Sequence, residues 1–255
     1  MGRYVITGIA SGIGAALASQ LKSDGHEVIG VDLKDAAVEA DLSTEEGRRA
    51  AVAALQPHVA DGVDGFVPLA GVAAGSGHDP KLITALNYFG TLALVEALKD
   101  AVARRRGSIV LVSSNSAAMA PHEFPLIEAL LSGDEAHALE VTAEQGMGLE
   151  YMAGKRALAY WMRRNAMSYA RAGVRINAVA PGPIDTPMTQ RLFDSADMKA
   201  AVDGLLGMTP IDRLGQADEV AKAIRFLLSS DAAYICGSVL FVDGGYDAAT
   251  RSDHL

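Results

Sequence analysis

The stretch Thr7-Gly8-Ile9-Ala10-Ser11-Gly12-Ile13-Gly14 decides the fold that we expect for this chain. It joins an apolar run, predicted to be a strand over Arg3–Thr7, to a helical pattern over Ile13–Lys22. Glycines at positions 8 and 12 allow a tight turn and a close approach of the backbone to a bound group. The free amides at the start of the helix attract an anion such as a pyrophosphate. We therefore predict a dinucleotide-binding turn, with an ordinary glycine-rich turn as the alternative; its cofactor-binding residues are Gly8, Ser11, Gly12, Ile13 and Gly14.

Apolar runs of strand length alternate with helical patterns along the rest of the chain. Such alternation predicts parallel crossovers, with helices on both faces of one sheet. We therefore expect one doubly wound α/β domain of about seven parallel strands that spans residues 1–255. Ser43 is expected to cap the helix Thr44–Gln56, with Glu46 completing a capping box. The other expected strands are Glu27–Asp32, Ala37–Ala40, Val63–Leu69, Ser108–Ser113, Arg175–Val179 and Ser238–Val242, and the other expected helices are Pro80–Arg105, Glu150–Ala172 and Ala217–Leu228.

The composition excludes several classes of protein. Half of the 255 residues are hydrophobic, which is enough to bury a core and excludes a disordered chain. Cys236 has no partner for a disulfide, so a reducing, cytoplasmic compartment is expected. We expect neither a membrane span nor a signal peptide, because no long apolar run occurs and the first strand begins at Arg3. The net charge of −9 argues against nucleic acid as a partner.

A carboxylate ends the second expected strand. Asp32 lies 18 positions after Gly14, the last glycine of the turn. A carboxylate there can hydrogen-bond both hydroxyls of an adenosine ribose and repels the 2′-phosphate of NADP. No Lys or Arg lies within the turn, so the pattern favours NAD; a surface Asp that caps a loop is the alternative. Asp41 and Leu42 follow the short third strand and could frame the adenine, although an Asp that simply leads into a helix fits equally well.

Tyr151 and Lys155 are four residues apart in the expected helix Glu150–Ala172, which places both side chains on one face. A free tyrosine titrates near 10 and is a poor base at neutral pH. A neighbouring ammonium favours the phenolate, so we expect Lys155 to lower the pKa of Tyr151. Such a tyrosine can exchange a proton with an alcohol oxygen. Tyr160 and Arg164 have the same spacing and are expected to form only a packed or solvated face.

Two further polar residues are candidates for the catalytic group. Ser114 follows an apolar strand at the carboxyl edge where open α/β sheets bind ligands, so its hydroxyl could hold a substrate oxygen. Asn87 lies inside an expected helix although Asn is a poor helix former, which indicates a local hydrogen-bonding role. Either residue could instead have a purely structural role. No metal is expected, because the spacing of the histidines at 58, 78, 122 and 137 is not that of metal ligands.

In combination, these residues resemble the short-chain dehydrogenase/reductase family, which has a Rossmann-type fold. The resemblance rests on motifs that occur in the family's order: Thr7-Gly-x-x-x-Gly-Ile-Gly14, Asp32, Asp41-Leu42, Ala70-Gly71, Asn87, Ser114, Tyr151-x-x-x-Lys155, Asn177, Pro181-Gly182 and Thr186. It implies that Tyr151 is the catalytic acid or base and that Ser114 polarises the substrate oxygen. It also implies that Lys155 lowers the pKa of Tyr151 and holds the nicotinamide ribose, and that Asn87 holds a water in a proton relay.

The resemblance further implies the remaining contacts to NAD. Ala70 and Gly71 would pass along the adenine ribose, and the residues expected to line the nicotinamide are Pro181, Gly182, Ile184 and Thr186. Leu33, next to Asp32, and Tyr151, on the same helix as Lys155, complete the expected cofactor-binding set. The resemblance implies a homotetramer that assembles through the two long helices near Asn87 and Tyr151. An insertion just before the second of these helices would cover that interface and leave a homodimer.

Two features depart from the family pattern. Pro68 and Leu69 stand where the family usually has two asparagines. Ser114 and Tyr151 are 37 residues apart, more than is usual, so residues 120–146 are expected to be a helical insertion, with two short helices broken near Gly133. An insertion at this place is shared with the bacterial hydroxysteroid dehydrogenase/carbonyl reductase branch of the family, which the chain resembles more closely.

The substrate side is expected to be apolar. Residues 184–208 are expected to arch over the site as a lid, and the apolar side chains that they and the insertion offer are Met188, Leu192, Phe193, Met198, Leu205, Leu206, Met208, Met119, Phe124 and Met147. A wall rich in methionine adapts to varied apolar shapes. The alternative is that these residues only pack the lid on its own domain.

We therefore predict an NAD-dependent oxidoreductase that transfers a hydride between nicotinamide and a secondary alcohol or ketone. The expected substrate is bulky and apolar, such as a hydroxysteroid or carbonyl compound. A reductase of small cyclic or aryl ketones and a non-catalytic nucleotide-sensing protein on the same fold are the alternatives. An enoyl reductase or epimerase resembles this Tyr–Lys spacing and this glycine turn less well.

Overall fold

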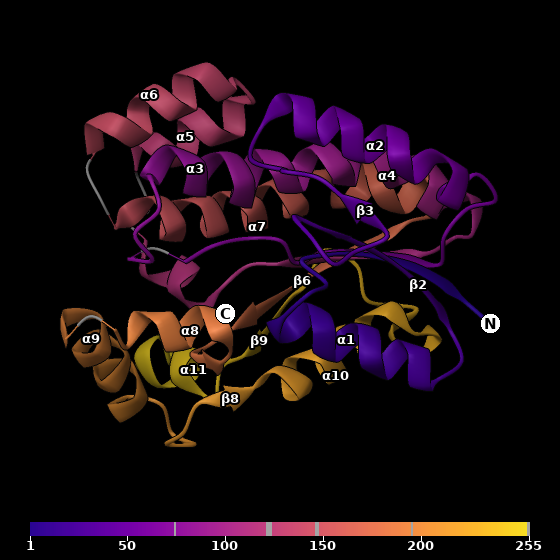
Figure 1. Cartoon of the computed structure of the whole chain (residues 1–255). Helices are drawn as coiled ribbons and strands as arrows, with labels where there is room; N and C mark the ends of the chain where they lie inside the picture. The colour runs from indigo at the N-terminus through magenta and orange to yellow at the C-terminus, as the bar shows by residue number, and fades with distance from the viewer. Residues whose placement is uncertain (74, 121–123, 146–147, 195, 254–255) are drawn as a thin grey trace.

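A single seven-stranded sheet organises the molecule. The structure is a computed structural model and describes residues 1–73, 75–120, 124–145, 148–194 and 196–253. Every strand of the sheet is parallel, in the order β3-β2-β1-β4-β5-β6-β9 (Figure 1). The predicted parallel sheet is thus confirmed. The strands are β1 Arg3–Thr7, β2 Glu27–Asp32, β3 Val38–Glu39, β4 Gly65–Pro68, β5 Ser108–Val112, β6 Arg175–Pro181 and β9 Val239–Val242.

Helices cover both faces of this sheet (Figure 1). One layer contains α2 Glu45–Val59, α4 Thr91–Arg104 and α7 Leu149–Arg171, and the other contains α1 Gly12–Ser23 packed against α10 Ala217–Leu228. Side chains of a strand alternate between the two cores because successive residues point to opposite faces.

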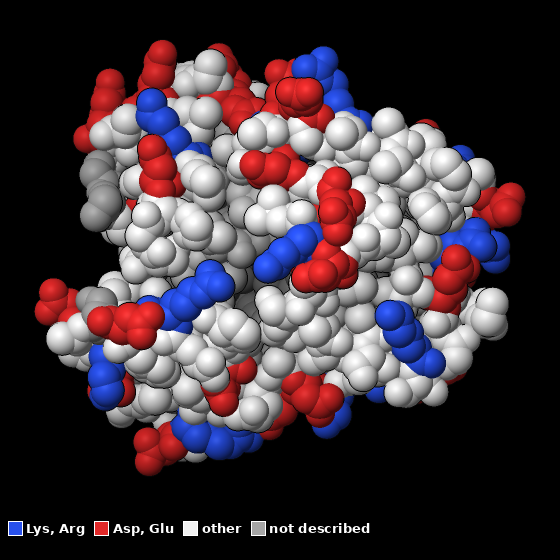
Figure 2. Space-filling model, viewed as in Figure 1, with Lys and Arg blue, Asp and Glu red and all other residues white. Residues whose placement is uncertain are grey.

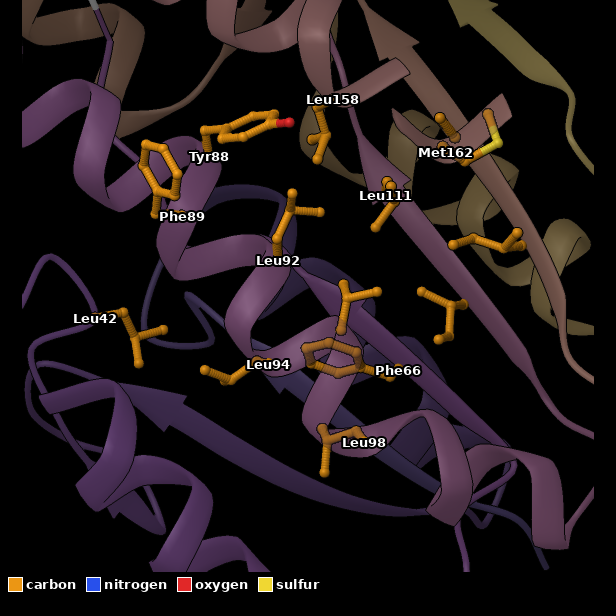
Figure 3. Packing of buried hydrophobic residues seen from close by; sticks show 14 of the residues in the cluster. Leu42, Phe66, Tyr88, Phe89, Leu92, Leu94, Leu98, Leu111, Leu158 and Met162 are labelled. Atoms are coloured by element: carbon orange, nitrogen blue, oxygen red, sulfur yellow. The ribbon is translucent and has the colours of Figure 1, made fainter. Parts of the chain in front are cut away.

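Two neighbouring residues of β1 show the alternation. Val5 packs in the core between the sheet and α4, and this core also contains Phe66 and Leu98 (Figure 3). Ile6 packs in the other core, between the sheet and the helices α1 and α10. The sheet is therefore buried on both sides, as its nearly continuous apolar strands predicted.

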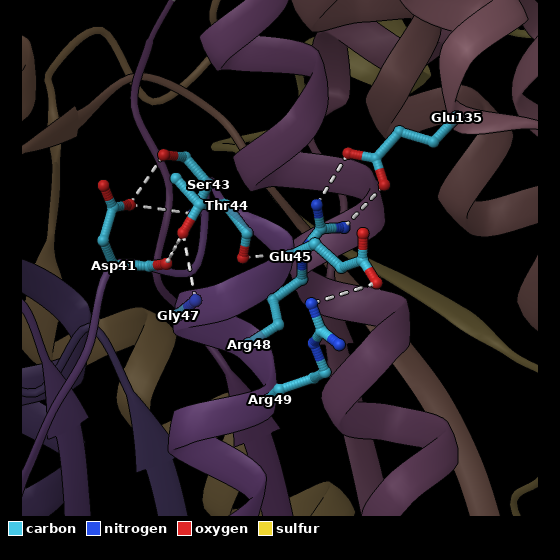
Figure 4. Close-up of polar contacts among 8 residues, drawn as sticks. All are labelled: Asp41, Ser43, Thr44, Glu45, Gly47, Arg48, Arg49 and Glu135. Carbon is cyan, nitrogen blue, oxygen red and sulfur yellow. Dashed lines mark hydrogen bonds and ion pairs between the residues drawn. The ribbon is translucent and has the colours of Figure 1, made fainter.

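The first turn of α2 corrects a prediction from the sequence. Its N-cap is Thr44, whose Oγ1 accepts a hydrogen bond from the Gly47 amide at 3.0 Å (Figure 4). Ser43 does not cap the helix, because its hydroxyl donates to Asp41 Oδ1 at 2.6 Å instead. With the cap at Thr44, the third helical position is Gly47, which has no side chain to close a capping box, so the role predicted for Glu46 was wrong.

A continuous helical segment over Pro80–Arg104 contains a change of helical pitch. It consists of α3 Pro80–Thr84, the π-helical turn η1 Ala85–Gly90 and α4. In the described part of the chain this is the one segment long and apolar enough to cross a membrane, but 67% of its most apolar window is buried inside the fold. Its apolar side chains are thus used by the core.

The segment before α7 forms two short helices, as predicted. They are α5 Pro125–Ser132 and α6 Glu135–Gln145, and they are separated at Gly133, which has a φ of +80°. α5 packs on α7, and α6 packs on α3. Arg48 of α2 donates two hydrogen bonds to Glu135, at 3.0 and 2.7 Å, which tie α6 to α2 (Figure 4).

The remaining elements lie toward the lower side of Figure 1 or at the strand ends. The two-residue strands β7 and β8 pair in parallel. They could not be predicted from the sequence, because two residues show no periodicity. These elements are β7 Ile184–Asp185, α8 Pro187–Leu192, α9 Ala196–Gly207, β8 Gly215–Gln216, α11 Tyr246–Thr250 and the 3-10 turns η2 Asn115–Met119 and η3 Ser230–Ala232. Acidic side chains are spread among basic ones over the face in Figure 2, which has no continuous basic surface.

Candidate active site

A cavity of about 490 Å³ opens at the carboxyl edge of the sheet. Every residue that the sequence assigned to the catalytic group or to the cofactor lines this cavity: Gly8, Ser11, Gly12, Ile13, Gly14, Asp32, Leu33, Asp41, Leu42, Ala70, Gly71, Asn87, Ser114, Tyr151, Lys155, Pro181, Gly182, Ile184 and Thr186. Parallel strands place their carboxyl ends at one edge, so residues distant in the sequence meet there.

The glycine turn has the backbone geometry that its sequence predicted. Gly8 has a φ of +70°, and a Cβ on it would lie 2.7 Å from the Ala70 backbone nitrogen. A Cβ on Gly14 would overlap the carbonyl oxygen of Gly8. Ser11, the N-cap of α1, forms no side-chain hydrogen bond to the first helical turn. The turn is therefore compact, and its helix amides are not occupied by the capping side chain.

Two carboxylates lie at one end of the cavity. Asp32 Oδ2 accepts from the Ala10 amide at 2.9 Å, and its Oδ1 accepts from the Leu33 amide at 2.8 Å. Asp41 Oδ1 accepts from both the amide and the hydroxyl of Ser43 (Figure 4). These bonds fix the orientation of both carboxylates.

At the other end of the cavity, α7 presents Tyr151 and Lys155. Lys155 is buried, and its Nζ donates to the Val112 carbonyl at 2.8 Å and lies 5.6 Å from the centre of the Tyr151 ring. Burial lowers the pKa of Lys155 to about 8. Ser113 Oγ donates to the Lys155 carbonyl at 2.9 Å, which joins α7 to the end of β5.

The electrostatics of Tyr151 differ from the sequence prediction. Burial raises the pKa of Tyr151, and a hydrogen bond with the Ser114 side chain acts in the opposite direction but does not outweigh burial. The expected lowering of this pKa by Lys155 was therefore wrong for this structure, because the desolvation of the phenolate dominates. Tyr151 is thus held in its protonated form at neutral pH.

The side chain of Asn87 forms hydrogen bonds with the backbone of a neighbouring loop. Its Oδ1 accepts from the Val72 amide at 3.0 Å, and its Nδ2 donates to the Val72 carbonyl at 2.8 Å. Asn87 lies in the π-helical turn η1, a feature frequent at functional sites. A Cβ on Gly71 would lie 2.8 Å from Asn87 Oδ1, so the glycine allows this clamp to form. The side chain shapes the cavity wall, and its expected bond to a relay water remains a prediction.

Some expected site neighbours do not line the cavity. Phe124 packs against the larger core. Met119 is half exposed, and its sulfur accepts a hydrogen bond from the Tyr246 hydroxyl. Of the expected lid residues, Met188, Leu192, Met198 and Leu205 line the cavity, whereas Phe193, Leu206 and Met208 do not. Met147 and His122 lie outside the described residues. In the second helical pair, the Tyr160 hydroxyl accepts a hydrogen bond from Arg156 Nε at 2.9 Å rather than from Arg164.

Several residues that line the cavity were not predicted from the sequence. Ser116 is the most informative, because its hydroxyl contacts Ser114 Oγ at 2.9 Å. Its position two residues after Ser114 was the one available indication. Apolar lining residues that were also missed are Val72, Ala73, Leu86, Met152, Ala201 and Val202.

Comparisons with known proteins identify the family. The model described as short chain dehydrogenase matches residues 3–126, and the model described as Enoyl-(Acyl carrier protein) reductase matches residues 136–247. The 3-alpha-hydroxysteroid dehydrogenase/carbonyl reductase of Comamonas testosteroni is 37% identical, over 98% of this chain and 98% of its own length. The chain belongs to the short-chain dehydrogenase family. As such, it is an oxidoreductase related to hydroxysteroid dehydrogenases, and the predicted resemblance is confirmed.

Two further known proteins match nearly the whole length of this chain. The coniferyl-alcohol dehydrogenase of Pseudomonas sp. (strain HR199 / DSM 7063) is 34% identical over 95% of each chain. The crystal structure of the 3-alpha-hydroxysteroid dehydrogenase from Pseudomonas sp. B-0831 complexed with NADH superposes with a TM-score of 0.95 at 42% identity. That match covers 99% of this chain and 100% of the solved one, so the fold is shared from end to end.

Proposed function

We propose that this short-chain dehydrogenase catalyses NAD-dependent hydride transfer between a secondary alcohol and a ketone. One observation carries the proposal: Tyr151, Lys155 and Ser114 line one end of the cavity, and the glycine turn and Asp32 line the other. A protein that only sensed a nucleotide would not need a tyrosine hydrogen-bonded to a serine beside a buried lysine. This arrangement supports an enzyme over the sensing alternative.

The residues present fit NAD. The compact turn from Gly8 to Gly14 lines the cavity with backbone, and the first amides of α1, which the Ser11 side chain does not cap, can bind a pyrophosphate. Asp32 would hold the hydroxyls of the adenosine ribose, and its charge disfavours the 2′-phosphate of NADP. Lys155 would hold the nicotinamide ribose. The related enzyme of known structure was solved with NADH, which supports the same cofactor here.

The chain's own residues would manage the proton and the substrate oxygen. NAD, when bound, supplies the hydride acceptor for alcohol oxidation and, as NADH, the hydride donor for ketone reduction. Tyr151 is protonated at neutral pH, since burial raises its pKa further above that of a free tyrosine, and it would give its proton to the ketone oxygen during reduction. In oxidation the deprotonated Tyr151 would accept the alcohol proton. Ser114 would hydrogen-bond the same oxygen and orient it.

We propose a bulky apolar substrate, such as a hydroxysteroid or another large carbonyl compound. Apolar side chains from α8 and α9 line the cavity together with Val72 and Met152, and the name of the related Comamonas enzyme includes both activities. Residues 184–208 would then act as a lid on a single domain, and residues 120–146 as an inserted segment. We further predict that the protein is cytoplasmic and forms a homodimer or homotetramer. Light scattering, which measures the mass of the assembly, distinguishes the two.

A substrate panel tests the function. The purified chain is mixed with NADH or NADPH and with steroid ketones, small cyclic ketones or aryl ketones, and the loss of the reduced-nicotinamide absorbance is followed. We expect turnover with NADH, slower turnover with NADPH, and the highest kcat/KM on the bulky ketones. Binding of NADH without turnover of any ketone would support the nucleotide-sensing alternative. A preference for the small ketones would contradict the proposed substrate class.

A further inference from the structure

Ser114 is held by the residue two positions further along the chain. Its Oγ accepts a hydrogen bond from the Ser116 amide at 3.2 Å and another from the Ser116 hydroxyl at 2.9 Å. A serine hydroxyl has two acceptor lone pairs and one donor proton. Ser116 therefore occupies both lone pairs of Ser114, and only the proton of Ser114 remains available to the cavity.

That remaining proton has no strong partner on its own turn. The Asn115 Oδ1 atom lies 3.5 Å from Ser114 Oγ, at the outer limit for a hydrogen bond. The other neighbour is Tyr151, whose hydrogen bond with Ser114 acts to lower its pKa. Because both lone pairs of Ser114 accept from Ser116, Ser114 can take part in this bond only as the donor. Ser114 therefore faces the reacting oxygens as a donor.

We propose that Ser116 is a positioning residue, which orients Ser114 as a hydrogen-bond donor to the substrate oxygen. The proposal rests on the proposed function. Ser114 is the N-cap of the 3-10 turn η2, and this turn brings the two serines together. A hydroxyl that accepts a hydrogen bond becomes a stronger donor, because bonds in a chain polarise one another. Ser116 thus acts through Ser114 and does not need to touch the substrate.

A substitution of one hydroxyl tests this role. Ser116→Ala removes the side-chain donor and keeps the backbone amide. We expect kcat/KM for ketone reduction to fall about threefold to tenfold, the range for one neutral hydrogen bond. The dissociation constant for NADH should stay unchanged, because Ser116 contacts Ser114 and not the glycine turn. Ser116→Thr, which keeps a hydroxyl, should restore most of the rate.

A matched control and a double variant separate positioning from a general effect on the fold. Ser132→Ala removes a hydroxyl that donates to the Ala129 carbonyl in α5, outside the cavity, and should leave kcat/KM unchanged. In a Ser114→Ala background, Ser116→Ala should cause no further loss, because its effect passes through Ser114. The single Ser116→Ala variant should also move the pH profile of alcohol oxidation to higher pH, since Tyr151 loses part of the support for its phenolate.

The outcomes distinguish this inference from the proposed function. If the wild-type chain turns over no ketone with NADH, the proposed function fails and the inference fails with it. If the wild-type chain is active and Ser116→Ala matches it, or if the two substitutions lower the rate independently, the inference alone is overturned. Should Ser116→Ala prove unstable, Ser116→Cys keeps the side-chain shape with a weak donor and is expected to show the same loss.

Discussion

The two halves of the cavity are built in different ways. The cofactor half consists largely of backbone: the glycine turn packs on itself and on the loop after β4 so closely that Cβ atoms added to Gly8 or Gly14 would overlap main-chain atoms. The substrate half is a wall of side chains from α7, α8, α9 and the loop after β4. Cofactor binding therefore depends on steric limits that the local sequence encodes. Substrate choice depends instead on which side chains of distant segments happen to face one another.

The largest effect is expected where backbone meets backbone. Gly8→Ala would place a Cβ 2.7 Å from the Ala70 nitrogen at a φ of +70°, so we expect NADH binding to be lost and the thermal midpoint to fall. Gly25→Ala is the matched control, because its φ is +79° but no atom lies within 4 Å of the added Cβ. That control should cost only the positive-φ strain, about 1–2 kcal/mol, and retain NADH binding. Calorimetry and fluorescence titration measure both quantities, and equal effects of the two variants would contradict the close-approach argument.

A smaller effect is expected at the carboxylate. Asp32→Ala removes the charged acceptor proposed for the adenosine ribose, so kcat/KM with NADH should fall about tenfold to a hundredfold. The value with NADPH should rise or stay constant, because the repulsion of the 2′-phosphate is removed. Asp35→Ala, an exposed carboxylate that does not line the cavity, should leave the ratio of the two unchanged. If the ratio of kcat/KM with NADH to kcat/KM with NADPH stays unchanged in the Asp32 variant, Asp32 does not select the cofactor.

The substrate half offers a matched pair on one helix. Leu205 lines the cavity and its neighbour Leu206 does not, although both are partly buried in α9. Leu205→Ala should lower kcat/KM for a bulky ketone about tenfold, the effect of a few lost methylene contacts, and change a small ketone less. Leu206→Ala should leave the ratio of bulky to small ketone unchanged. The same ratio in both variants would show that the lid packs without contacting substrate.

The smallest change is expected from pH. Because burial raises the pKa of Tyr151, its deprotonated form becomes populated only as the pH rises. We therefore expect kcat/KM for alcohol oxidation to rise from neutral to alkaline pH, while that for ketone reduction stays level until the pH approaches the raised pKa of Tyr151. Tyr160→Phe is the control, since that hydroxyl accepts from Arg156 and lies outside the cavity. A flat profile for oxidation would argue against Tyr151 as the base.

These two halves also differ in how far the sequence could predict them. The bounds of β1 and β2 and the residues of the glycine turn agree with the structure, because glycine spacing and apolar runs are local properties. The cap of α2 was assigned to Ser43 instead of Thr44, because Asp41 competes for the Ser43 hydroxyl. A competition among neighbouring hydrogen bonds of this kind is not visible in the pattern.

Errors on the substrate side arise from tertiary packing. Phe124 was expected in the cavity wall but packs in the core, and an apolar residue gives no local indication of which of the two it will line. The direction of the Tyr151 pKa shift was also wrong. Its spacing from Lys155 follows from helical geometry, whereas its burial depends on the segments that pack around α7.

The division of work between the two halves is tested most directly by Tyr151→Phe. The variant lacks only the phenolic oxygen, which lies outside the proposed cofactor half. NADH binding is followed by fluorescence and NADH oxidation by absorbance in the same solution with a bulky ketone that the wild-type chain reduces. The account predicts NADH affinity like that of the wild-type chain and a fall in turnover of about a hundredfold or more. Wild-type turnover in this variant would contradict the central role of Tyr151.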